Sequence, residues 1–212
     1  METIKKIFSH LGVIPVVVIN DPKDALPLAE ALIEGGLPCA EVTLRTEAAE
    51  ASIRLISQTY PDMLVGAGTV LTLDQVKRTA AAGAKFIVSP GFDPEIVDYC
   101  ISEQIPVFPG CMTSSEIIQA VKRGLTAVKF FPAQPAGGPA MLKALSAPFP
   151  GLSFMPTGGI GPDNLADYLS LKPVLCCGGS WMVKQSLIQA GEFSKIASLA
   201  REARELVLQI RK

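Results

Sequence analysis

This 212-residue sequence contains a single histidine, His10. A Ser-His-Asp or Cys-His catalytic group, or a histidine-ligated metal site, would have to use this residue near the N-terminus. A lone histidine in such a position is typically solvated. The scarcity of histidine therefore argues against all three kinds of site.

Charge is also scarce, and it is balanced. Only 18% of the residues are charged, and 19 basic residues face 20 acidic ones, for a formal net charge of −1. Disordered chains combine low hydrophobicity with high charge, so a hydrophobic content of 49% excludes that class. Binding to nucleic-acid phosphates requires a basic excess, so we expect no nucleic-acid partner.

No apolar stretch approaches the length of about 18 residues that a membrane span needs. The apolar stretch 12–19 follows Lys5 and Lys6, as in a signal peptide, but Pro15 interrupts it and no small-residue cleavage site follows. We therefore expect a soluble, cytoplasmic protein with no membrane contact.

The five cysteines include no C-x-x-C pair, and their number is odd. All of them lie inside or beside apolar runs, which predicts buried, reduced thiols of a cytosolic protein rather than disulfides or metal ligands. They are Cys39, Cys100, Cys111, Cys176 and Cys177.

A recurring alternation fills the chain without a low-complexity linker, so we expect one domain over residues 1–212. Each short run rich in Val, Ile, Phe or Leu is followed by a turn and an Ala- and Leu-rich segment with helical spacing. This unit recurs about eight times. The expected strands are 14–19, 40–44, 64–70, 86–89, 105–108, 127–131, 153–157 and 174–177.

Alternating strands and helices favour the α/β class with a parallel sheet, and strands that are apolar throughout are typical of burial on both faces. Eight units predict a closed (β/α)8 TIM barrel. The alternative is a doubly wound open sheet, which usually carries G-x-G-x-x-G after its first strand. Here Asn20-Asp21-Pro22 follows that strand, without a glycine.

Lys129 lies late in the apolar strand 127–131, where the strands of a barrel carry its chemistry. Burial disfavours the charged form of an amine, so this lysine is a candidate nucleophile toward a carbonyl group. The alternative is a lysine that reaches the rim or pairs with a carboxylate.

Polar residues also interrupt the second expected strand. Glu41, Thr43 and Arg45 share one face of it, which we expect to point into the barrel mouth. A buried glutamate near a lysine can exchange protons with a substrate, and an arginine suits a carboxylate. An ion pair within the barrel is the structural alternative. Thr69 ends the segment Gly66-Ala67-Gly68-Thr69 and adds a hydroxyl near backbone that glycine leaves exposed. The alternative is a β-forming residue in a turn.

Two glycine pairs follow the seventh and eighth expected strands. They are Gly158-Gly159 and Gly178-Gly179, and Ser180 comes directly after the second pair. Barrels often bind phosphate with the loops at these two positions, because glycine lets backbone N–H groups approach an anion. Ser180 could cap the helix that follows it. Plain tight turns are the alternative.

Taken together, six segments resemble the bacterial 2-keto-3-deoxy-6-phosphogluconate (KDPG) aldolases, which are also described as 4-hydroxy-2-oxoglutarate aldolases. They occur in the order of that family and span about residues 41 to 181. The segments are Glu41-Val42-Thr43-Leu44-Arg45-Thr46, Gly66-Ala67-Gly68-Thr69-Val70, Ser89-Pro90-Gly91, Lys129-Phe130-Phe131-Pro132-Ala133, Pro156-Thr157-Gly158-Gly159-Ile160 and Gly178-Gly179-Ser180-Trp181.

The resemblance implies a class I aldolase on a (β/α)8 barrel that uses no metal or cofactor and forms a homotrimer. It would cleave KDPG to pyruvate and glyceraldehyde 3-phosphate, a step of the Entner-Doudoroff pathway. Lys129 matches the lysine that forms the Schiff base, and Glu41 matches the general acid/base. Arg45 and Thr69 match positions that hold the pyruvate carboxylate.

The remaining matches divide between the two halves of such a substrate. Those for the pyruvate pocket are Pro90, Phe131 and Thr157, and those for the phosphate are Gly158, Gly159 and Ser180. One departure is visible, because the family often reads Phe-Phe-Pro-Ala-Glu and this chain has Gln134 at the last position. We do not associate that position with the chemistry.

Three other functions stay open. The same chemistry could act on 4-hydroxy-2-oxoglutarate and give pyruvate and glyoxylate. A phosphosugar isomerase would use Glu41 as a base without an imine. A phosphometabolite-binding barrel without catalysis would leave Lys129 dispensable, although burying such groups without a use is costly.

Overall fold

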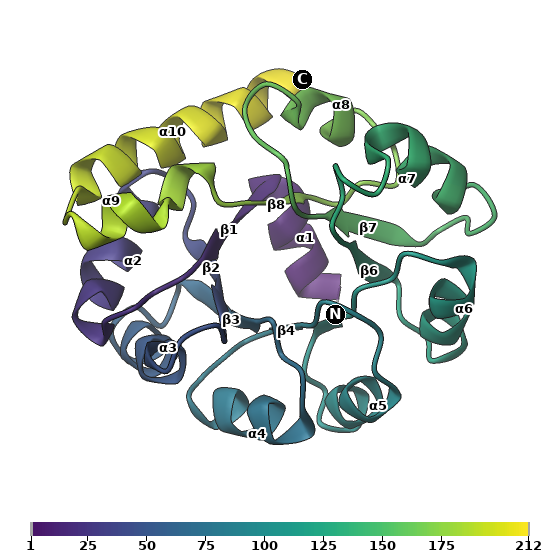
Figure 1. Ribbon diagram of the computed structural model, residues 1–212, viewed down its shortest axis with the longest axis horizontal. Coiled ribbons are helices and arrows are strands. Elements are labelled where there is room, and N and C mark those ends of the chain that lie inside the picture. Colours follow the sequence, from purple (N-terminus) through teal and green to yellow (C-terminus); the bar gives the residue numbers. More distant parts are fainter. Residues whose placement is uncertain (1, 212) are drawn as a thin grey trace.

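Eight short parallel strands form a closed ring with helices around its outside (Figure 1). The computed structural model describes residues 2–211. Six strands pair in the order β5-β4-β3-β2-β1-β8, β6 pairs with β7, and the bridges Gly110↔Lys129 and Thr157↔Gly178 join the two sheets. The predicted (β/α)8 barrel is confirmed.

The strands are β1 Val13–Val17, β2 Cys39–Thr43, β3 Leu64–Gly68, β4 Ile87–Val88, β5 Val107–Phe108, β6 Ala127–Phe130, β7 Ser153–Pro156 and β8 Cys177–Gly179. The helices are α1 Glu2–Leu11, α2 Ala25–Glu34, α3 Ala48–Thr59, α4 Leu73–Ala81, α5 Pro94–Ser102, α6 Ser114–Lys122, α7 Gly138–Ser146, α8 Leu165–Leu169, α9 Gln185–Gln189 and α10 Phe193–Ile210. Two 3-10 turns, η1 Pro22–Asp24 and η2 Trp181–Val183, precede α2 and α9.

The eighth strand lies later in the chain than the sequence predicted. Val174 makes a single bridge to Phe154, and the ladder with β1 runs through Cys177, Gly178 and Gly179. The second glycine pair is therefore part of the strand and not of the loop after it. Close packing explains this, because a Cβ at Gly178 would lie 2.4 Å from Thr157 Oγ1.

Helix α1 was not predicted, and it closes the end of the barrel where the strands begin. Its buried face carries Phe8, whose ring centroid lies 5.1 Å from that of Phe86 and 5.1 Å from that of Phe108. Lys5 Nζ also donates a hydrogen bond of 3.2 Å to Thr126 Oγ1, just before β6. In Figure 1, α1 accordingly projects within the ring of strands.

All five cysteines are free and buried, as the sequence predicted. Burial raises the pKa of the Cys100 and Cys111 thiols to about 12, so both stay protonated at neutral pH. Within residues 2–211, no helix is both long enough and apolar enough to cross a bilayer.

Phe8→Ala should destabilise the protein by roughly 3–5 kcal/mol, because it removes a fully buried ring and leaves a cavity at the closed end of the barrel. The free energy of unfolding in urea measures this loss. Ile7→Ala on the same helix is the matched control, since Ile7 is 38% exposed and should cost far less. Equal losses for both variants would show that α1 does not close the barrel as described.

Candidate active site

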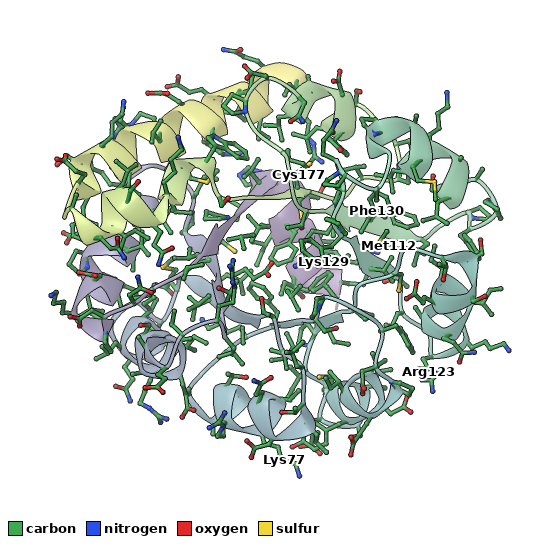
Figure 2. The ribbon with its side chains drawn as sticks, in the orientation of Figure 1. Lys77, Met112, Arg123, Lys129, Phe130 and Cys177 are labelled. Carbon is green, nitrogen blue, oxygen red and sulfur yellow. The ribbon has the colours of Figure 1, made fainter. Side chains whose placement is uncertain are left out.

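A lysine and a glutamate meet in the interior of the barrel. Lys129 in β6 and Glu41 in β2 come from opposite sides of the ring, and Lys129 Nζ lies 3.2 Å from Glu41 Oε1. The two side chains are only 6% and 0% exposed. Figure 2 shows Lys129 in the middle of the ring, whereas Lys77 and Arg123 lie on its outer surface. The structure therefore brings together the two residues at the centre of the sequence prediction.

The neighbouring strand makes room for Glu41. Gly68 in β3 pairs with Thr43 in β2, and a Cβ on Gly68 would lie 2.3 Å from Glu41 Oε1. Only a residue without a side chain fits there, so this glycine allows the carboxylate to reach Lys129. The next residue, Thr69, has φ +55°, an uncommon and strained conformation for a β-branched residue.

One oxygen of Glu41 has no protein partner. Oε1 accepts the hydrogen bond from Lys129, but Oε2 is buried and, among residues 2–211, is the only buried side-chain N or O atom without a partner. Leaving a buried carboxylate oxygen unsatisfied destabilises a fold. Such an atom is suited to exchanging a proton with a bound molecule.

A cavity of about 410 Å³ opens at the end of the barrel where the strands finish. The ring of Phe131 belongs to its wall, and its centroid lies 5.1 Å from Lys129 Nζ. The cavity therefore lies next to the buried amine. The predicted site residues that line it are Arg45, Phe131, Thr157, Gly158, Gly159 and Ser180.

Four of the predicted residues do not line this cavity. Lys129 and Glu41 are buried in the barrel interior. Thr69 follows β3 and Pro90 follows β4, so both lie at the correct end of the barrel, but neither lines the cavity. The Pro90 carbonyl packs closely over the chain after β5, where a Cβ on Gly110 would lie 2.1 Å from its oxygen.

Arg45 is an exposed cation at the cavity mouth, held by its neighbours in the chain. The Thr43 hydroxyl donates to the Val17 carbonyl at 2.9 Å, and the Thr46 hydroxyl donates to the Ile19 carbonyl. These bonds tie the end of β2 to the end of β1 on both sides of Arg45. No ion pair involves this arginine within residues 2–211, so its guanidinium is available to an anion.

The loop after β7 presents backbone donors. Gly158 and Gly159 have φ +101° and +74°, and neither the Gly159 nor the Ile160 N–H donates to another group in residues 2–211. The Gly158 carbonyl accepts from Gln134 N at 3.0 Å. In a trans peptide the N–H points away from the C=O, so the Gly159 N–H is turned away from Gln134.

The prediction that Ser180 caps a helix was wrong. Ser180 occupies the position before η2, but its side chain makes no capping hydrogen bond and instead lines the cavity. Lys184, which was not among the predicted site residues, is an exposed cation in the cavity wall directly after η2. The only signal for Lys184 was its position four residues after Ser180.

The chain is similar to known proteins over most of its length. A family model described as "Aldolase: KDPG and KHG aldolase" matches residues 4–199. The chain is 47% identical to a 2-dehydro-3-deoxy-phosphogluconate aldolase of Treponema pallidum over 98% of this chain and 99% of the relative. It is 46% identical to the KHG/KDPG aldolase of Escherichia coli K12, over 91% of each.

A solved structure of a KDPG aldolase from Legionella pneumophila has the same fold. It superposes with a TM-score of 0.91, at 45% identity, over 94% of this chain and 97% of that one. That protein is described with pyruvate captured at low pH as a covalent carbinolamine intermediate.

Gly68→Ala should destabilise the protein by about 1–3 kcal/mol, because the added methyl group overlaps the Glu41 carboxylate. Chemical unfolding monitored by circular dichroism measures the effect. Gly91→Ala is the matched control, since a Cβ there meets nothing within 4 Å. If Gly68→Ala were as stable as Gly91→Ala, Glu41 would not occupy the position described.

Proposed function

The chain belongs to the KDPG and KHG aldolase family and is a lyase, and from this premise we propose that it cleaves KDPG through a Schiff base on Lys129. The buried contact of 3.2 Å between Lys129 Nζ and Glu41 Oε1, next to the cavity, is the observation that carries this proposal. The products are pyruvate and glyceraldehyde 3-phosphate.

Lys129 first gives a proton to Glu41, and the resulting neutral amine attacks the C2 ketone of the substrate and forms a carbinolamine. Glu41 protonates the leaving hydroxyl, so that water departs and an iminium remains. It then takes the proton from the C4 hydroxyl, directly or through a water, and the C3–C4 bond breaks with its electrons moving into the iminium. Glyceraldehyde 3-phosphate leaves, and protonation and hydrolysis of the remaining enamine release pyruvate. The unpaired Oε2 atom of Glu41 supports this proton-transfer role.

The pyruvate half of the substrate is assigned to the end of the cavity near Lys129. Arg45 supplies the cation for the carboxylate, and Thr69 supplies a hydroxyl at the same end of the barrel. Phe131 and Thr157 line the cavity and are assigned to the walls around the three carbons. Pro90 lies outside this lining and is assigned to the pyruvate pocket on the family resemblance alone. The contact of Phe131 with Lys129 supports this placement for its ring.

The phosphate half is assigned to Gly158, Gly159 and Ser180. Free N–H groups in a glycine loop are suited to an anion, and the contacts they make far from the reacting carbons would supply binding energy that orients the substrate. Lys184 lines the same wall and adds the cation that those groups lack.

We also propose activity on 4-hydroxy-2-oxoglutarate, giving pyruvate and glyoxylate. Its reacting half is the same as in KDPG, and the Escherichia coli relative is named for both substrates. Its second carboxylate is attached directly to C4, well short of the phosphate on C6 of KDPG, so we expect this substrate not to reach the glycine loop.

Borohydride added together with pyruvate should fix a covalent adduct on Lys129, visible by peptide mass, because reduction traps the imine. Lys129→Met should lose both the adduct and aldol cleavage. Glu41→Gln should still bind pyruvate but should lower kcat by about 100-fold or more. An adduct on another residue would refute the mechanism, and turnover without any adduct would favour an isomerase-type reaction.

Lys184→Gln should raise KM for KDPG by roughly fivefold at low salt and leave kinetics on 4-hydroxy-2-oxoglutarate unchanged, because it removes one cation from the phosphate end. Lys172→Gln is the matched control, since this exposed lysine precedes β8 at the opposite end of the barrel. An equal change on both substrates would remove Lys184 from the phosphate site.

A further inference from the structure

Asn164 stands at the start of α8 but does not cap this helix. An asparagine at such a position commonly accepts a hydrogen bond from the first turn of its own helix. Here both polar atoms of its side chain instead bond to the loop that precedes α8. Asn164 Oδ1 accepts from Gly161 N at 2.9 Å, and Asn164 Nδ2 donates to the Gly159 carbonyl at 3.0 Å.

Two further side chains hold Asn164 in this orientation. The Tyr168 hydroxyl donates a hydrogen bond of 2.7 Å to Gln134 Oε1, and Asn164 Nδ2 lies 3.5 Å from the same oxygen. The Tyr168 residue is 0% exposed, and burial raises the pKa of its hydroxyl, so it remains a donor at neutral pH. Gln134 Oε1 accepts hydrogen bonds and therefore needs the nitrogen of Asn164, not its oxygen, on its side. This fixes the Asn164 amide with Nδ2 toward the Gly159 carbonyl.

This network determines which way the loop peptides face. The Gly158 carbonyl is held by Gln134 N, and the Gly159 carbonyl is held by Asn164 Nδ2. Each carbonyl points toward the network, so the N–H on the other side of each peptide, from Gly159 and from Ile160, points away from it. Both residues line the cavity. If the network were lost, the glycines could rotate and the two N–H groups would no longer be held in these directions.

We propose that Asn164, oriented by Gln134 and Tyr168, is a positioning residue that sets the preference for phosphorylated substrates. The inference rests on the proposed function, because it assigns the Gly159 and Ile160 amides to the substrate phosphate. None of the three side chains has a place in the imine chemistry. The second carboxylate of 4-hydroxy-2-oxoglutarate lies too close to C4 to reach these amides, so the network should affect only one of the two substrates.

Tyr168→Phe is the first test, because it deletes the hydroxyl and keeps the buried ring. KM for KDPG should rise about fivefold, the value of one ordinary hydrogen bond, while kcat and the kinetics on 4-hydroxy-2-oxoglutarate stay within about twofold. Tyr99→Phe is the matched control. Tyr99 is half-buried on α5, its hydroxyl has no hydrogen bond within residues 2–211, and its loss should change neither substrate.

Asn164→Asp is the second test. The aspartate can still accept from Gly161 N, but it places an oxygen against the Gly159 carbonyl where a donor stood. KM for KDPG should rise by about tenfold or more, because a bond is replaced by repulsion. Competitive inhibition by inorganic phosphate should weaken in parallel, and half-saturation of pyruvate trapping on Lys129 should not change.

The outcomes separate this inference from the function on which it rests. The positioning role is supported if KM rises for KDPG only, inhibition by inorganic phosphate weakens, and the thermal unfolding midpoint stays unchanged. An equal rise in KM for both substrates, or no rise for either, overturns the positioning role but leaves the proposed aldolase activity standing. If the unmodified protein cleaves neither substrate and traps no pyruvate on Lys129, the proposed function and this inference fall together.

Discussion

The contact between Lys129 and Glu41 inside the barrel constrains the rest of the structure. Two ionisable side chains are taken out of water on opposite strands, and each depends on the other for compensation. Their contact in the interior depends on a closed ring and on the absence of a side chain at Gly68, and α1 covers the far end of the same ring. Burial of the pair without a use would only lower stability, so its presence next to an open cavity is an argument for chemistry.

The site depends on positions without a side chain as well as on its polar side chains. A Cβ on Gly68 would collide with Glu41, one on Gly178 with Thr157, and one on Gly110 with the Pro90 carbonyl. In each case a glycine on one strand or strand end lets a functional group on its neighbour come closer than ordinary packing permits. These three glycines therefore occur where neighbouring βα units come into close contact, and not only where the chain turns.

The sequence predicted what depends on pattern along one strand. Apolar runs located seven strands closely. The late position of Lys129 in one run, and the shared face of Glu41, Thr43 and Arg45 in another, singled out the two residues that the structure brings into contact. The sequence did not locate β8, because a Gly-Gly pair is typical of a turn. Gly178 and Gly179 become a strand only through pairing with β1 and close packing against Thr157. Helix α1 was missed for a related reason, since its partners Phe86 and Phe108 lie far away in the chain.

Asn164 shows what sequence patterns cannot predict, namely the hydrogen-bond partners of a side chain. Asn164 stands directly before α8, and the pair Gly158-Gly159 predicts an anion loop. Neither position reveals that the asparagine binds the loop and leaves its own helix uncapped. The direction of a peptide N–H is fixed by the partner of the carbonyl across the same bond. Substrate preference in this barrel can therefore depend on Gln134 and Tyr168, whose mutual hydrogen bond acts on the loop through Asn164.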